Sequence, residues 1–106
     1  MNTYILAKRL AHHVIFYHMY TEDFKVKVLA EYEKAALKLA FHLNCADHEP
    51  TEEIKKKYYQ KAWKAVIKLE TYYEQVEMQE IDCKEYIIGK YIAKIKRSLK
   101  KELSQD

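Results

Sequence analysis

Residues that stop helices are almost missing from this chain. Its 106 residues include one Gly and one Pro, whereas Ala, Leu, Lys, Glu and Tyr are frequent. Most of these frequent residues favour helices, so the composition predicts an all-helical protein. The same scarcity excludes glycine-rich phosphate-binding loops, which need several positions that only Gly tolerates. Nucleotide-dependent chemistry is therefore not expected.

Apolar residues recur at three- and four-residue intervals, which predicts four helices. A chain this short holds one hydrophobic core, so residues 1–106 are expected to form one domain. The helices are expected at about residues 2–20, 22–43, 52–79 and 83–103. The clearest break is Asn44 to Pro50, after which Thr51 is expected to cap the third helix. Since no Gly or Pro lies between the first two segments, one long helix over residues 1–43 is an alternative.

The third and fourth helices are predicted to form a tight hairpin. Asp82 and Glu85 have the spacing of a capping box, so the fourth helix is expected to begin almost directly after the third ends. A connection that short makes the two helices antiparallel neighbours. The expected fold is an antiparallel four-helix bundle.

Positive charge is ordered oppositely along these two helices. Lysines fill the first part of the third helix and the last part of the fourth, so an antiparallel hairpin places the two basic halves side by side at one end. Lysines at the start of a helix oppose its dipole, which suggests a use. RNA or DNA phosphates are the expected partner, although a merely solvated surface is the alternative. The expected phosphate contacts are Lys55, Lys56, Lys57, Lys61, Lys64, Lys94, Arg97, Lys100 and Lys101.

A second apolar stripe lies beside the core stripe of the same two helices. Apolar residues on two flanks of a bundle predict self-association. Some of the aromatic residues could instead stack on unpaired bases. The expected subunit interface comprises Tyr59, Trp63, Val66, Ile67, Ile87 and Tyr91.

Patterns typical of catalysis, metal binding and membrane insertion are absent from the sequence. Cys45 and Cys83 do not form a C-x-x-C pair, and the five histidines form neither H-E-x-x-H nor Glu-x-x-His. We therefore expect two reduced cysteines, no metal, no cofactor and no enzymatic activity. No apolar run approaches the length of a membrane span or a signal peptide, so a cytoplasmic protein is expected.

Three stretches carry a resemblance to a known family. They are KVKVLAEYEKAALKLAFHLNCA from Lys25, KAWKAVIKLETYYEQVEMQEID from Lys61, and YIIGKYIAKIKRSLKKEL from Tyr86. Together they resemble the four-helix-bundle family that contains the accessory variability proteins of diversity-generating retroelements and the proteins encoded in intervening sequences of bacterial 23S ribosomal RNA genes. The resemblance implies a homopentameric barrel with a basic surface that binds nucleic acid. For the retroelement branch it also implies partnership with a reverse transcriptase and its template RNA.

Two functional hypotheses follow from the sequence. The first is a non-enzymatic, oligomeric accessory protein that binds nucleic acid, to which the family resemblance adds assistance to a reverse transcriptase. The second is a helical protein-interaction module, of the antitoxin or inhibitor type, whose basic end docks an acidic protein.

Overall fold

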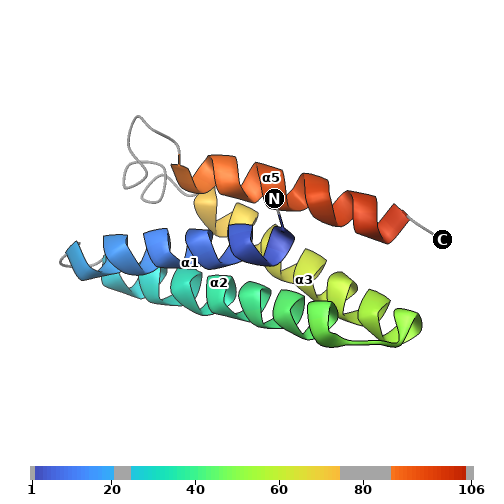
Figure 1. Cartoon of the computed structure of the whole chain (residues 1–106). Helices are drawn as coiled ribbons and strands as arrows, with labels where there is room; N and C mark the ends of the chain where they lie inside the picture. The colour runs from blue at the N-terminus through green and yellow to red at the C-terminus, as the bar shows by residue number, and fades with distance from the viewer. Residues whose placement is uncertain (1, 21–24, 75–86, 105–106) are drawn as a thin grey trace.

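Four helices make up the described part of the protein. A computed structural model describes residues 2–20, 25–74 and 87–104, with their side chains except those of residues 16–20, 25–29 and 87 (Figure 1). The helices are α1 (Thr3–Tyr20), α2 (Lys25–His48), α3 (Glu52–Tyr73) and α5 (Ile87–Ser104). They pack against one another, and the described residues contain no strand. The predicted all-helical class is confirmed.

The helices pack as a ring in which each contacts two neighbours. α1 packs on α2 and α5, and α3 packs on the same two helices from the other side (Figure 1). The α2–α3 side of the bundle therefore lies opposite the α1–α5 side. The Cα atoms extend over 45 × 20 × 20 Å, so the bundle is an elongated rod. Because α1 and α2 lie side by side, the alternative of one long helix over residues 1–43 is wrong.

Neighbouring helices run antiparallel, as contacts between their opposite ends demonstrate. Tyr73, the last residue of α3, lies against Gly89 near the start of α5. The hydroxyls of Thr3 and Ser98 form a hydrogen bond that joins the start of α1 to the second half of α5. The predicted antiparallel pairing of the third and fourth helices is confirmed, although the short link proposed as its cause falls within residues 75–86, outside the described residues.

The second helix ends at His48, so the predicted end at Leu43 is wrong. The backbone oxygen of Asn44 accepts a hydrogen bond from Nδ1 of His48, at 2.9 Å. Ala46 is fully buried. Burial of Ala46 in the helical conformation outweighs the tendency of Asn44 to end a helix, and the helix stops only before Pro50.

The third helix starts where the sequence predicts and ends earlier. Thr51 occupies the N-cap position with extended backbone, but its side chain makes no capping hydrogen bond. α3 ends at Tyr73 instead of Gln79. In its last turn Thr71 Oγ1 donates a hydrogen bond to the backbone oxygen of Ile67, at 3.0 Å, a bond of the kind that slightly destabilises and bends a helix. The predicted start of the fourth helix near residue 83 lies outside the described residues.

The core is formed by all four helices. Its members alternate at helical spacing, and each helix places one apolar stripe toward the axis. The largest fully buried side chains are Tyr32, Leu10, Leu39, Leu43, Leu69, Ile88, Ile95, Leu99, Val14 and Val66. Tyr32 of α2 also packs on Tyr72 of α3, with ring centroids 6.4 Å apart. This packing sets the rotation of α2 and α3 about their axes, and so determines which side chains line the surface where the two helices meet.

Candidate nucleic-acid interface

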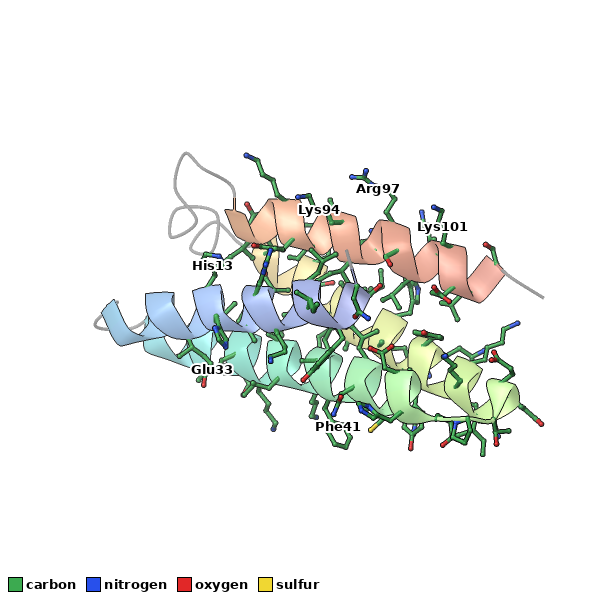
Figure 2. The ribbon with its side chains drawn as sticks, in the orientation of Figure 1. His13, Glu33, Phe41, Lys94, Arg97 and Lys101 are labelled. Atoms are coloured by element: carbon green, nitrogen blue, oxygen red, sulfur yellow. The ribbon has the colours of Figure 1, made fainter. Side chains whose placement is uncertain are left out.

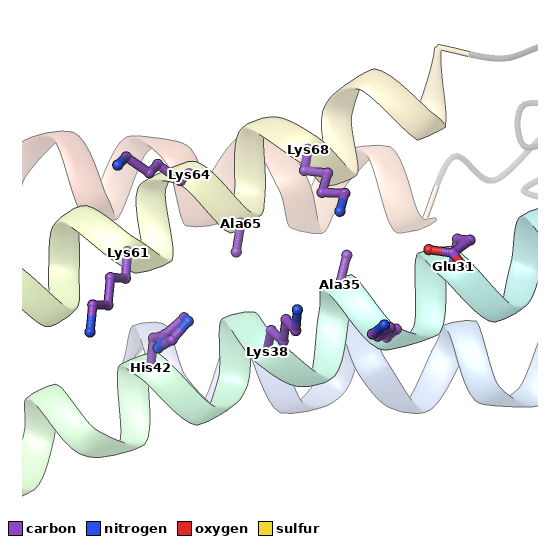
Figure 3. Close-up of a pocket in the computed structure, with 9 residues that line it drawn as sticks. Glu31, Ala35, Lys38, His42, Lys61, Lys64, Ala65 and Lys68 are labelled. Carbon is purple, nitrogen blue, oxygen red and sulfur yellow. The ribbon is translucent and has the colours of Figure 1, made fainter.

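Lysines from two helices surround a groove between α2 and α3. The floor of this α2–α3 groove includes two small residues, Ala35 and Ala65, one from each helix (Figure 3). The open space above them is about 290 Å³. The polar residues that line it are Glu31, Lys34, Lys38, His42, Lys61, Lys64 and Lys68.

Helical spacing explains why these lysines meet. Lys34 and Lys38 lie one turn apart on α2, and Lys64 and Lys68 lie one turn apart on α3, so each pair projects from one side of its helix. Tyr72, four residues after Lys68, carries the ammonium of Lys68 over its ring at 6.0 Å from the centroid. All five lysines of the groove are exposed. Among the described residues that line the groove, Glu31 is the one carboxylate, so the net charge there is strongly positive.

His42 lies in the same groove and responds to these charges. Burial lowers the pKa of its imidazole, and the nearby ammonium groups of Lys61 and Lys38 lower that pKa further. The Nδ1 atom is buried and has no hydrogen-bond partner among the described residues. Protonation would create a buried N–H donor next to two cations, so His42 is neutral at neutral pH.

A second basic surface follows the outward side of α5. Lys90, Lys94, Arg97 and Lys101 recur at intervals of four, three and four residues, so they form one row, which we name the α5 stripe. The labelled members of the row, Lys94, Arg97 and Lys101, point away from the bundle in Figure 2. Three of the four also line a cavity of about 430 Å³ that reaches Leu6 of α1. No acidic residue occurs in the sequence between Ile87 and Lys101.

The predicted phosphate-binding residues are divided between these surfaces instead of forming one basic end. Lys61 and Lys64 line the α2–α3 groove. Lys94, Arg97 and Lys101 belong to the α5 stripe. A cavity of about 510 Å³ between α3 and α5 brings Lys57 together with Lys61 and Lys64. Lys55 and Lys56 are half-buried and Lys100 is exposed, and none of these three lines any of the described cavities.

The end of the bundle itself carries carboxylates. Burial raises the pKa of Tyr59, and the negative charges of Glu102, Asp47 and Glu52 raise that pKa further. These three carboxylates lie on α5, α2 and α3, so acidic groups from three helices meet near one tyrosine. Carboxylates therefore lie among the lysines of this end, and positive charge also runs along two sides of the rod.

Sequence reasoning missed the contributions of α2 and of Lys90 at the start of α5. Lys34, Lys38, Lys68 and Lys90 were not among the expected contacts. The four-residue spacing of Lys34 and Lys38 was a readable signal. Its meaning depended on knowing that α2 packs beside α3, which the charge order of the last two helices does not reveal.

Most residues of the expected subunit interface pack within the four-helix bundle of a single chain. Val66 is fully buried in the core, because its position on α3 faces the bundle axis, so its assignment to an outer stripe is wrong. Tyr59, Trp63 and Tyr91 are half-buried and pack against the core. Tyr91 of α5 also contacts His13 of α1, with ring centroids 5.5 Å apart.

The remaining predicted interface residues are Ile67, which is half-buried, and Ile87, whose side chain lies outside the described residues. Larger exposed apolar side chains occur elsewhere, on α2. Leu37 is 48% exposed and Phe41 is 62% exposed, and they lie one turn apart. Phe41 points away from the bundle in Figure 2. Whether the protein self-associates stays a prediction.

Comparison of the chain with protein-family models, curated proteins and solved structures found no match. None of the described helices is long and apolar enough to cross a membrane. Within the same residues, no three His, Cys, Asp or Glu side chains are grouped as metal ligands would be. Cys45 is half-buried and has a free thiol, while Cys83 lies outside the described residues.

Proposed function

We propose that the protein is a non-enzymatic accessory protein that binds nucleic acid through the phosphate backbone, with the α2–α3 groove as its principal site. The observation that carries this proposal is the convergence of five exposed lysines from two helices on one groove with a single carboxylate. Concentrated like charge costs stability, and a polyanion that neutralises it recovers that cost.

The length of the groove suits a chain of phosphates. Lys61 and Lys68 are separated by seven residues, or about 10 Å of helix at a rise of 1.5 Å per residue. A row of that length can meet successive phosphates of one strand, and Lys34 and Lys38 supply a parallel row on the facing helix. The small side chains of Ala35 and Ala65 leave room for a backbone to approach (Figure 3).

The chemistry of the groove favours contact with phosphate over reading of bases. Lysine is a compact point charge, whereas bidentate recognition of guanine is typical of arginine. All five cations that line the α2–α3 groove are lysines. On the same helix, three residues after Lys38, Phe41 presents an exposed ring on which an unpaired base could stack. Binding to single strands without strong sequence preference is the expected behaviour.

A salt titration of oligonucleotide binding tests the proposal. Each phosphate contact to a single strand contributes about −0.7 to the slope of log K against log salt. The variant Lys38→Gln/Lys64→Gln/Lys68→Gln is therefore expected to make that slope shallower by about 2 and to weaken binding at low salt. The control is Lys8→Gln, at an exposed lysine outside the groove and outside the expected phosphate contacts, which should keep the native slope. Absence of binding by the native protein at low salt, or equal loss in both variants, would refute the assignment.

Docking of an acidic protein is the second candidate function, and the exposed apolar pair on α2 favours it. Leu37 and Phe41 lie beside the lysines of the groove, a combination of apolar and charged groups that protein interfaces use. Co-purification from the native host separates the candidates. Recovery of nucleic acid, alone or with a reverse transcriptase, supports the first. Recovery of an acidic protein without nucleic acid, lost in Leu37→Ser/Phe41→Ser, supports the second.

A further inference from the structure

We propose that one copy of the protein holds two nucleic-acid strands at once, one in the α2–α3 groove and one on the α5 stripe, and thereby brings the strands together. This inference rests on the proposed function, because it assumes that the lysines bind phosphate. It goes further by giving the protein two sites and a bridging activity.

The two basic surfaces face opposite sides of the bundle. In the ring of helices, the α2–α3 side lies opposite the α1–α5 side. Figure 3 looks into the groove and shows α5 and α1 behind it. The α5 stripe points away from the bundle, on the far side from α2 (Figure 2). A strand that lies straight along one surface cannot contact the other, because the rod between them is about 20 Å thick between Cα atoms alone.

Each surface has enough charge to bind a strand by itself. The groove holds five lysines against one carboxylate. The α5 stripe has four cations, and Lys90 and Lys101 are separated by about 16 Å of helix at 1.5 Å per residue. No acidic side chain lies in the sequence of α5 before Glu102. Both rows therefore match several phosphates of a backbone.

The side of the bundle between the two surfaces is neutralised in its middle. Nζ of Lys96 lies 2.7 Å from Oε2 of Glu70, and the same ammonium lies 5.9 Å from the ring centroid of Trp63. Lys96 is thus paired across the α3–α5 seam and lies between the two rows of cations. Nearer the start of α3, the cavity with Lys57 adjoins the groove. That cavity offers one strand a route around the rod, so the experiment must distinguish one wrapped strand from two bridged strands.

The test uses two sets of short oligo(dT) strands, one with a donor dye and one with an acceptor dye. Such strands do not pair with each other, so energy transfer between the dyes reports that one protein holds both. Anisotropy of the donor strand measures binding separately. Energy transfer is expected with the native protein when strands are twice as abundant as protein. When protein is in excess, most copies hold only one strand. The energy transfer should then fall about in proportion to the excess of protein, as expected for a protein with two linked sites.

Two variants of equal charge assign the strands to the surfaces. The groove variant is Lys38→Gln/Lys64→Gln/Lys68→Gln, and the stripe variant is Lys94→Gln/Arg97→Gln/Lys101→Gln. Each is expected to retain binding by anisotropy through its intact surface and to lose most energy transfer, at least fivefold. The control Lys8→Gln, at an exposed lysine outside both basic surfaces and outside the expected phosphate contacts, should retain both signals.

The outcomes separate failure of the inference from failure of the proposed function. No anisotropy change with any protein would refute nucleic-acid binding itself. Binding without energy transfer would mean that one strand wraps the rod, and would overturn the bridging proposal alone. Energy transfer that persists in both single-surface variants would also overturn it, because bridging would then come from association of several copies.

Discussion

The lysines of the α2–α3 groove affect the pKa of His42, and through it the pH dependence of stability. Its pKa lies below the ordinary value of 6.5, first because of burial and then because Lys61 and Lys38 repel the imidazolium. Glu31 is the one carboxylate among the residues that line the same groove. The folded protein consequently binds a proton at His42 less readily than the unfolded chain does. The stability that this difference provides is fully present above about pH 6.5 and is lost as pH falls through the lowered pKa.

Replacement of His42 should therefore change how stability depends on pH. In urea unfolding, the variant His42→Gln is expected to lose less stability than the native protein between about pH 7.5 and pH 5, because Gln does not titrate. His12 is exposed, and His12→Gln is the matched control for the loss of a histidine side chain. Equal losses in the native protein and in His42→Gln would contradict the assigned environment.

At the scale of a single residue, the sequence did not distinguish His42 from the other four histidines. A lowered pKa requires both burial and nearby cations, and one of those cations, Lys61, comes from another helix. The sequence did identify Lys61 and Lys64 as candidate phosphate ligands, because clusters of lysine at helical spacing are visible directly. Val66 is the opposite case: the sequence placed it on the outer face of its helix, whereas in the structure it faces the core.

At the scale of helices, the seam between α3 and α5 depends on the only glycine of the chain. A Cβ at position 89 would lie 2.8 Å from the hydroxyl oxygen of Tyr73 and 3.0 Å from its Cζ. In an unobstructed helix interior, replacement of Gly by Ala stabilises a protein by about 0.5–1 kcal/mol. Here a rigid ring occupies the space that the methyl group would need, so overpacking opposes the gain.

The variant Gly89→Ala is accordingly expected to be no more stable than the native protein, and less stable by about 1 kcal/mol if Tyr73 cannot shift. Removal of the ring gives the control. In a Tyr73→Ala background, Gly89→Ala should stabilise by about 0.5–1 kcal/mol, as helix propensity dictates. Chemical denaturation of the four proteins measures both effects. Stabilisation of similar size in both backgrounds would show that Tyr73 does not limit the approach of α5.

The presence of each described helix could be predicted from the sequence, whereas the residues at which α2 and α3 end could not. Apolar periodicity found all four described helices because it reflects the stripe that each must bury. The end of α2 was wrong because Asn44 was judged by its local tendency, while burial of Ala46 prolongs the helix. The end of α3 was wrong because apolar spacing continues past Tyr73 in the sequence, whereas the helix ends there with Glu74 as its C-cap.

At the scale of the whole molecule, the order of charges in the sequence predicts where they lie along the bundle axis. It does not predict which side of the bundle they face. The antiparallel pairing of α3 and α5 was foreseen, so their lysines were correctly expected to lie near each other along the axis. Which side of the rod each lysine faces depends on the neighbours of its helix, and α2 was not considered a neighbour of the basic region. The two opposite basic surfaces are therefore a feature that the charge order of the last two helices does not predict.

This distribution of charge also predicts how little the protein should depend on base identity. Arg97 is the one arginine of the two basic surfaces, and its neighbours on the α5 stripe are lysines that act as point charges. If Arg97 contacts phosphate, Lys can replace it, whereas the contact of a planar guanidinium fork with guanine is not preserved when Lys replaces Arg. Homopolymers of dT, dC and dA of equal length are therefore expected to bind within about threefold of one another, with equal salt slopes.

Comparison with a guanine-containing strand of the same length completes the test of Arg97. Arg97→Lys should leave all four affinities unchanged within error, whereas Arg97→Gln should weaken all of them to the same extent and make the salt slope shallower by about 0.7. A native preference for guanine that disappears in Arg97→Lys would instead mean that the α5 stripe reads bases. The stripe would then select the strand that the protein brings to the one held in the groove.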